Sequence, residues 1–289
     1  MHYKGDIYRP PSEANSILLQ VTTGCSHNRC TFCGMYKNSS FSIKDESTVM
    51  ADIDFAAGNF RRQNRLFLCD GDALILPQER LRSILIAIRG KLPWIKRIGT
   101  YASTDSIKRK TGEELKELKD LGLAIAYLGL ESGDDRTLED IGKNADSACM
   151  IEMGKKIRSA GIKLSITVIL GIAQIERSLI HARETGRVLS AIDPEYVGAL
   201  SLMLTPGTRI YREWQEGNWI LPGAREMLEE LRTMIAGTEL SNGYFHANHA
   251  SNYLPIKARF PEDKPATLEL IDKALKGQIS LKPEHMRAL

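Results

Sequence analysis

Apolar and polar positions along this 289-residue chain follow two alternating patterns. Short apolar runs of strand length are followed by stretches in which apolar residues recur every three or four positions, the period of an amphipathic helix. The predicted strands cover residues 16–22, 65–69, 95–101, 123–130, 162–170 and 196–203. The predicted helices cover residues 45–62, 77–89, 112–121, 224–235 and 266–276. Several helical stretches are predicted over residues 134–160, and a further helix follows residue 176 and runs to about residue 189.

Strand and helix alternate six times between residues 16 and 211. This alternation is typical of βαβ units, which have right-handed crossovers and a parallel sheet. Residues 1–15 contain Pro10-Pro11 and are expected to form an extended lead-in. Residues 212–289 leave the alternation, and we expect a mainly helical C-terminal cap packed on the core. The sequence therefore predicts an α/β domain between a short lead-in and an extension.

Composition and charge change this picture little. Hydrophobic residues make up 43% of the chain and charged residues 26%, which is ordinary for a globular protein. The net charge of +3 neither requires nor excludes a nucleic-acid partner. The longest apolar runs, such as residues 165–170, are too short to span a bilayer, and the first six residues carry no apolar signal segment. We therefore expect a cytoplasmic protein with no membrane partner.

Three of the five cysteines lie within nine residues, directly after the first predicted strand. Cys25, Cys30 and Cys33 have the spacing C-x4-C-x2-C. The carboxyl end of a strand is where parallel α/β folds bind cofactors, and bunched cysteines in a reducing compartment indicate metal or redox chemistry. Three thiolates can hold a [4Fe–4S] cluster and leave one iron open. Zinc with His27 as a fourth ligand, or redox cysteines without metal, are the alternatives.

Further motifs follow in an order that resembles the radical S-adenosylmethionine (SAM) superfamily over about residues 15–210. Phe32 directly precedes the last of the three cysteines, and Asp70-Gly71-Asp72 ends the second strand, where the family has a Gly-Gly-Glu-like turn. The fourth strand ends in the segment LGLESGDDRTL, residues 128–138. This segment is similar to the subgroup of Elongator-type, methylthiotransferase-type and coproporphyrinogen-type enzymes.

The resemblance implies a partial (β/α)6 TIM-like barrel and a [4Fe–4S] cluster held by Cys25, Cys30 and Cys33. SAM would chelate the open iron, and the reduced cluster would cleave SAM to methionine and a 5′-deoxyadenosyl radical. The cofactors carry this chemistry, while the protein supplies binding and orientation. An electron donor such as flavodoxin or ferredoxin would be a partner.

Resemblance also suggests the residues that contact SAM at the strand ends. Gly71 and Asp72 would receive the methionine amino group, a cation that suits a carboxylate and backbone carbonyls. Glu131 and Ser132 would bond to polar groups of SAM, at its ribose or its methionine end.

The adenine of SAM would lie near Phe32, with Gly171 and Leu204 flanking it from later strands. Two features of the chain depart from the family pattern. One extra residue separates the first two cysteines, since the commonest family spacing is C-x3-C-x2-C. The fifth strand ends in Gly171-Ile-Ala-Gln-Ile-Glu176, where relatives tend to carry a second glycine.

The C-terminal extension contains a dense polar and aromatic stretch over residues 244–253. Tyr253 and His246 are candidates there for a substrate contact or for a donor that quenches a radical. The alternative is a loop whose side chains bond to the backbone. Asp134 and Asp135 are expected to begin a helix, where acidic side chains are favourable.

These observations favour a radical SAM enzyme that abstracts hydrogen from a small polar substrate. Two alternatives stay open at this point. The same chemistry could modify a nucleic acid or a peptide. A non-catalytic chaperone that binds haem or SAM is the other, because haem chaperones occur among the coproporphyrinogen-type relatives. The substrate and the oligomeric state are not fixed by the sequence.

Overall fold

A computed structural model describes residues 1–288, and the contacts within the chain form two compact units. The first unit comprises Met1–Asn28, Met35–Leu128 and Lys155–Leu164. The second comprises Arg29–Gly34, Gly129–Gly154 and the chain from Ser165 onward. The cysteine loop is therefore shared, with Cys25 in the first unit and the other two cysteines in the second.

Parallel strands form the centre of the first unit. In sheet order they are β1 (Ile17–Gln20), β4 (Arg65–Cys69), β5 (Arg97–Ala102) and β6 (Leu123–Glu131). Leu66, Phe67, Leu68 and Cys69 of β4 are all buried, so both faces of this strand are covered, as in parallel sheets generally. Strands β2 (Thr22–Thr23) and β3 (Ser42–Ile43) form a separate antiparallel pair.

The helices of the first unit follow the strands in chain order. They are η1 (Pro11–Glu13), α1 (Glu46–Asn59), η2 (Ala73–Ile75), α2 (Gln78–Lys91), α3 (Thr104–Lys108) and α4 (Gly112–Asp120). Helix α2 packs against both α1 and α4. A reciprocal capping box starts α4, because Thr111 Oγ1 accepts from the amide of Glu114 while the Glu114 carboxylate accepts from the amide of Thr111.

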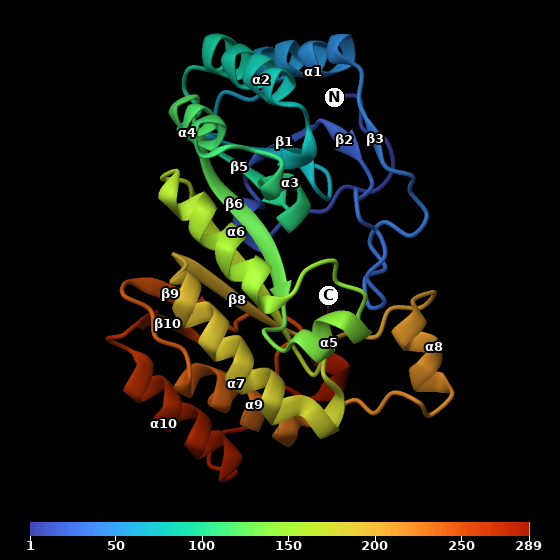
Figure 1. The fold of residues 1–289 in the computed structure, drawn as a ribbon, viewed down its shortest axis with the longest axis vertical. Helices are drawn as coiled ribbons and strands as arrows, with labels where there is room; N and C mark the ends of the chain where they lie inside the picture. Colours follow the sequence, from blue (N-terminus) through green and yellow to red (C-terminus); the bar gives the residue numbers. More distant parts are fainter. Residues whose placement is uncertain (289) are drawn as a thin grey trace. The chain divides into compact units, whose positions relative to one another are not determined.

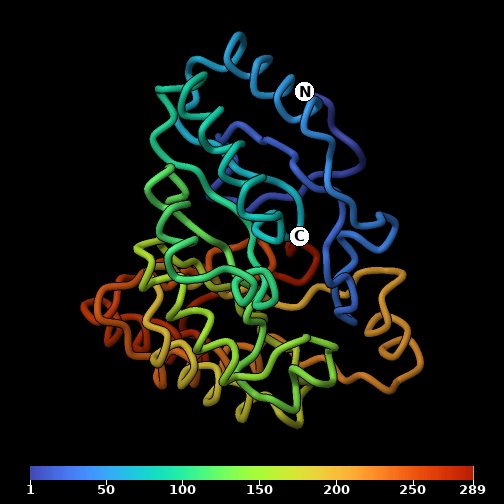
Figure 2. Tube along the Cα trace, turned by 45° about the horizontal axis from the view of Figure 1, so that its top comes forward, coloured from blue at the N-terminus to red at the C-terminus, as the bar shows by residue number. Residues whose placement is uncertain are grey.

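Strands of the second unit are β7 (Lys163–Leu170, from Ser165 onward), β8 (Tyr196–Ser201) and β9 (Gly243–His246), which pair in parallel. Strand β10 (Lys257–Phe260) pairs antiparallel with β9. The segment before residue 289 (red in Figure 2) is bonded to the chain just after β8, because Arg287 donates to the carbonyl of Leu202 at 3.1 Å.

Helices of the second unit include a stack formed by α7 (Gln174–Ile192), α9 (Ala224–Ala236) and α10 (Lys264–Leu275). Helix α9 packs against both α7 and α10, and Figure 1 draws the three beside β8, β9 and β10. The remaining helices are α5 (Asp135–Asp140), α6 (Ser147–Ser159), which runs on into residues of the first unit, α8 (Arg209–Gln215) and η3 (Glu284–Met286).

The predicted strands and most predicted helices are confirmed, with differences at short elements. Helices α3 and α8 were not predicted, whereas the helical stretches predicted over residues 134–160 are present as α5 and α6. The alternative of a loop throughout residues 244–253 is wrong at its start, because Tyr244–His246 belong to β9. Phe245 is fully buried while Tyr244 is exposed, which is the two-residue alternation of a strand. The extension thus contributes two strands besides its helices.

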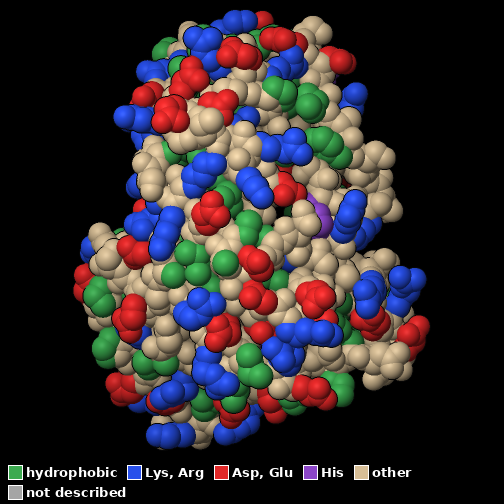
Figure 3. Space-filling model, in the orientation of Figure 1, with side chains coloured by type: hydrophobic (Ala, Val, Ile, Leu, Met, Phe, Trp, Pro, Cys, Tyr) green, Lys and Arg blue, Asp and Glu red, His purple; other side chains and the backbone are tan. Residues whose placement is uncertain are grey.

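On the face drawn in Figure 3, basic and acidic side chains are interspersed, with no large field of one sign. This distribution agrees with the mild net charge of +3. Within residues 1–288, no helix is both long enough and apolar enough to cross a bilayer.

Candidate functional site

Cys25, Cys30 and Cys33 are all half-buried, and no cysteine within residues 1–288 forms a disulfide bond. Among residues 1–288, no three Cys, His, Asp or Glu side chains converge into a metal-binding group. The donors nevertheless suit a [4Fe–4S] cluster in kind, because they are three thiols on one loop and iron–sulfur clusters are held by cysteine thiolates.

The backbone between Cys30 and Cys33 is held from two sides within the second unit. The amide of Thr31 donates to the carbonyl of Ile141 at 2.8 Å, and the carbonyl of Thr31 accepts from the amide of Ile210 at 3.2 Å. These bonds attach the loop to the residue after α5 and to the first turn of α8. Two of the three candidate ligands therefore flank a hydrogen-bonded segment.

Gly34, directly after Cys33, lies close to the chain that follows β8. A methyl group added at Gly34 would lie 2.5 Å from Cγ2 of Thr205, which is too close for any real contact. Glycine is needed here because the loop and the residues after β8 approach each other so closely.

Phe32 and Leu204, both predicted to lie near the adenine, pack on the same apolar cluster of the second unit. Its buried members include Ile172, the neighbour of Gly171. Two of the predicted adenine contacts therefore pack on one apolar cluster, and the third is next in sequence to a member of that cluster. The cluster consists of Leu138, Ile141, Ile172, Leu202, Ile210 and Trp219.

Asp72 lies in the first unit and is fully buried. Its Oδ2 accepts from Ser26 Oγ and from Ser103 Oγ, both at 2.7 Å, and its Oδ1 accepts from the amide of Ser103 at 3.2 Å. Burial raises the pKa of Asp72, and the serine hydrogen bonds oppose that rise. Because Ser26 directly follows Cys25, the Asp72 carboxylate ties the first cysteine to the turn after β4.

Gly71 brings the same turn into contact with Cys25. A methyl group at Gly71 would lie 2.8 Å from the Tyr36 ring and 3.0 Å from Cβ of Cys25. The Tyr36 hydroxyl donates to Asp70 at 2.8 Å, and burial followed by the Asp70 charge raises the pKa of Tyr36. In the turn at residues 70–72, Gly71 therefore lies against Cys25, while the residues before and after it, Asp70 and Asp72, accept hydrogen bonds.

Glu131, a predicted SAM contact, has a left-handed backbone with φ of 63°. Its carboxylate lies 2.9 Å from Nζ of Lys143, and only 8% of the residue is exposed. A residue other than glycine in this region costs about 1–3 kcal/mol, and such residues cluster at functional sites. The backbone at Glu131 therefore supports the prediction of a site at the end of β6.

Ser132, the other predicted contact on this turn, is fully buried. Its hydroxyl lies 2.7 Å from Nδ1 of His181 and accepts from the amide of Asp134 at 3.0 Å. In this structure the Ser132 side chain therefore faces α7 and the start of α5.

The expectation that Asp134 begins a helix is confirmed. Asp134 accepts from the amide of Thr137 at 3.2 Å as the N-cap of α5, and Arg177 donates to it from α7 at 2.8 Å. Asp135 accepts from the amide of Ser147 at 2.7 Å, at the start of α6.

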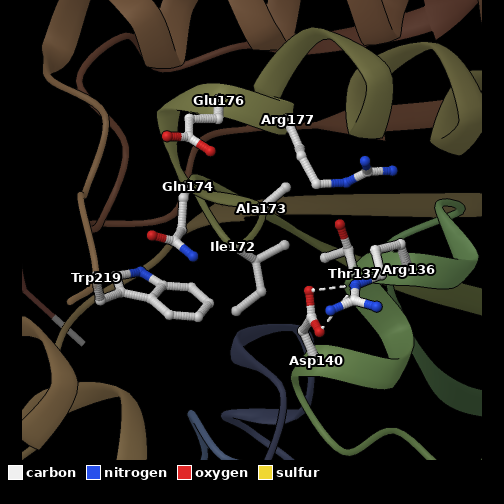
Figure 4. Close-up of a pocket in the computed structure, with 9 residues that line it drawn as sticks. All are labelled: Arg136, Thr137, Asp140, Ile172, Ala173, Gln174, Glu176, Arg177 and Trp219. Carbon is white, nitrogen blue, oxygen red and sulfur yellow. Dashed lines mark hydrogen bonds and ion pairs between the residues drawn. The ribbon is translucent and has the colours of Figure 1, made fainter.

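Gly171 directly follows β7 with φ of 79°, and its amide donates to Oε1 of Glu230 at 2.7 Å. A cavity of about 320 Å³ lies beside the residues that follow it. Figure 4 shows Arg136 reaching Asp140 at its rim, and Arg177 is bound to Asp134, so both guanidinium groups of the lining are already paired. The lining comprises Arg136, Thr137, Asp140, Ile172, Ala173, Gln174, Glu176, Arg177 and Trp219.

Tyr253 is buried with its hydroxyl bonded to Glu284 and, at 2.6 Å, to Arg287. Burial, then the hydrogen bond to Glu284, raises the pKa of Tyr253 to about 12. The neighbouring Asn252 donates to the carbonyl of Ala199 at 2.8 Å. These contacts favour the structural alternative for this end of the stretch.

His246 is half-buried on β9. Its Nε2 is buried and has no hydrogen-bond partner within residues 1–288. Burial, and then Lys257, lowers the pKa of His246. A role for His246 towards a substrate stays a prediction.

Sequence reasoning missed two buried polar residues beside the predicted SAM contacts. His181 lies on the buried face of α7, and Glu230 lies on the buried face of α9. A signal for both was present, because each falls at a position where the helical period requires an apolar residue. Lys143, the partner of Glu131, has no such signal.

Comparison with known proteins gives one family and several distant relatives. A model of the Radical SAM superfamily matches residues 19–183. The haem chaperone HemW of Bacillus subtilis (strain 168) is 22% identical over 189 residues, which cover 65% of this chain and 49% of HemW. Uncharacterized protein MJ0486 of Methanocaldococcus jannaschii is 22% identical over 277 residues, which cover 92% of this chain and 81% of that protein.

A solved structure of the radical SAM methyltransferase TsrM from Kitasatospora setae, with cobalamin and a [4Fe–4S] cluster bound, superposes with a TM-score of 0.57. It is 17% identical and covers 70% of this chain and 39% of TsrM. This likeness shows the fold, and the predicted α/β partial-barrel class is confirmed. The chain spans about half the length of HemW.

Proposed function

The chain belongs to the radical SAM superfamily, whose model matches more than half of its length, and from this we propose that it cleaves SAM reductively and abstracts hydrogen from a small polar substrate. The expected cofactors, a [4Fe–4S] cluster and SAM, are confirmed as those of the family. The observation that carries the proposal is that the matched region contains the whole cysteine loop and the turns at residues 70–72 and 131–133.

We assign Cys25, Cys30 and Cys33 as the ligands of three irons. When bound, the cluster supplies the electron that breaks a carbon–sulfur bond of SAM. The chain's own residues hold the thiols in place. Asp72 binds Ser26 beside Cys25, and Thr31 fixes the segment between the other two cysteines through its hydrogen bonds to Ile141 and Ile210.

The proposal includes a one-electron donor such as flavodoxin or ferredoxin, because the cluster must be reduced before each SAM cleavage. It also includes a cytoplasmic location. The substrate class follows the sequence prediction of a small polar molecule.

Production of 5′-deoxyadenosine tests the activity. Anaerobically reconstituted protein with a strong reductant and SAM should release 5′-deoxyadenosine and methionine even without substrate, because members of this family cleave SAM slowly when uncoupled. Cys33→Ala should abolish the product, whereas Cys149→Ala, outside the loop on α6, should leave it unchanged. Absence of the product from a protein that holds both cluster and SAM would contradict the proposal.

The similarity to HemW favours one second candidate, a chaperone that binds haem. The two candidate functions differ in whether SAM is cleaved. A chaperone would bind hemin stoichiometrically and release no deoxyadenosine under strong reduction, whereas the enzyme would release it with or without hemin. The same incubation, repeated with hemin, therefore separates them.

A further inference from the structure

Three fully buried polar side chains form a chain of contacts in the second unit. Ser132 Oγ lies 2.7 Å from Nδ1 of His181, and Nε2 of His181 lies 3.4 Å from Oε1 of Glu230. None of the three is exposed at all. They come from the turn after β6, from α7 and from α9, so the contacts join elements far apart in the sequence.

Glu230 accepts hydrogen bonds from two further groups. The amide of Gly171 donates to its Oε1 at 2.7 Å, and the Ser178 hydroxyl donates to its Oε2. A buried carboxylate without partners would be strongly unfavourable, so these donors account for its presence on the apolar face of α9. Glu230 thus binds the turn after β7 directly. It also faces the imidazole of His181, which contacts the turn after β6.

The tautomer of His181 decides the direction of these contacts. With the ring proton on Nε2, that N–H faces Glu230 and Nδ1 accepts from the hydroxyl of Ser132. The Ser132 oxygen accepts from the amide of Asp134 as well. The contact of 3.4 Å between Nε2 and Glu230 is not a hydrogen bond, and within residues 1–288 this buried nitrogen has no hydrogen-bond partner.

Gly133, the next residue of this turn, is also held by a side chain of α7. The amide of Gly133 donates to Oγ1 of Thr185 at 2.8 Å, and Thr185 in turn lies 3.3 Å from Nδ1 of His181. His181 therefore contacts both side chains that fix the turn at residues 131–133.

We propose that Glu230 and His181 are positioning residues of the SAM site, which set the turns at residues 131–133 and 171–173 relative to each other. This inference rests on the proposed function for the ligand, but the coupling of the two turns is a property of the polypeptide itself. Glu230 lies beyond the region matched by the family model, which ends at residue 183. The C-terminal extension is then part of the cofactor site.

The variant Glu230→Gln tests the inference, because it keeps the size of the side chain and replaces one acceptor oxygen by a donor. Binding of SAM to the cluster-loaded, unreduced protein should weaken about tenfold, while iron content stays the same. In the protein without SAM, hydrogen exchange should accelerate at the amide of Gly171 and in residues 131–134. The neighbouring Glu229→Gln is the matched control, because Glu229 is paired at the surface with Arg225 and should leave both measurements unchanged.

His181→Asn and Ser178→Ala carry the same test if Glu230→Gln fails to fold, since Ser178→Ala removes a single donor to Glu230. Unchanged SAM affinity and unchanged exchange at the two turns would overturn the inference. A uniform rise of exchange throughout the second unit would also overturn it, because a merely structural residue has that effect. Wild-type protein that binds no SAM would contradict the proposed function, while the exchange measurement would still decide whether the two turns are coupled.

Discussion

Asp134 shows how one side chain fixes a turn beside the predicted SAM contacts. It caps α5 and also accepts three hydrogen bonds from the guanidinium of Arg177 on α7. Burial raises the pKa of Asp134, but the hydrogen bonds from Arg177 and Thr137 outweigh burial and leave the pKa lowered. The carboxylate therefore stabilises the folded state in its ionised form.

Replacing Asp134 by Asn should keep the helix cap and lose the ion pair. We expect a loss of about 1 kcal/mol in the free energy of unfolding at pH 7, because solvent screens the pair at the partly exposed Arg177. The folded-state pKa is lowered, so this contribution is complete above the unfolded value of about 3.9 and disappears as the pH falls through the folded-state pKa. Denaturant unfolding of both proteins from pH 7 to pH 3 checks this, and a difference independent of pH would contradict it.

Single residues of the site were predictable where their chemistry is rare. Cys25, Cys30 and Cys33 stand out because bunched thiols have few other uses. The partners of Asp72 were not predictable, because Ser26 and Ser103 are ordinary polar residues whose meaning depends on a contact between distant segments. Sequence spacing says nothing of such contacts.

At the scale of elements, the loop over residues 29–34 is held by three residues from two segments of the second unit. Ile141 and Ile210 bond to its backbone, and Thr205 lies against Gly34. Because two candidate ligands belong to this loop, its conformation should control whether the cluster is retained.

Gly34→Ala should lower the iron content of the protein, because the added methyl group collides with Cγ2 of Thr205 and displaces the loop. The double variant Gly34→Ala/Thr205→Ser lacks that colliding methyl group and should regain most of the iron. Iron analysis after identical anaerobic reconstitution measures both. Equal iron in Gly34→Ala and wild type would show that the loop position does not matter for the cluster.

Long elements with a clear period were predicted well from the sequence, as β4 and α9 show. Strand β9 was missed because its polar and aromatic residues look like a loop, and only pairing with β8 and β10 makes it a strand. The short helices α3 and α8 have too few residues for a period to emerge. Tertiary pairing therefore decides where local pattern is weak.

At the scale of the whole molecule, the segment matched by the family model contains residues of both compact units. The match over residues 19–183 includes Cys25 of the first unit and the other two cysteines of the second. The order of motifs along the chain predicted the family, the fold class and the cofactors. The contacts that residues 212–288 make with the strand ends could not be predicted. They depend on tertiary hydrogen bonds, from Gly171 to Glu230 and from Arg287 to Leu202.

The central claim is that three cysteines hold a [4Fe–4S] cluster, and the iron and sulfide content of the reconstituted protein tests it most directly. We expect about four irons and four sulfides per chain in the wild type and in Cys149→Ala, and loss of the cluster in Cys30→Ala. Protein that binds only zinc, or a Cys30→Ala variant that keeps a full cluster, would contradict the claim.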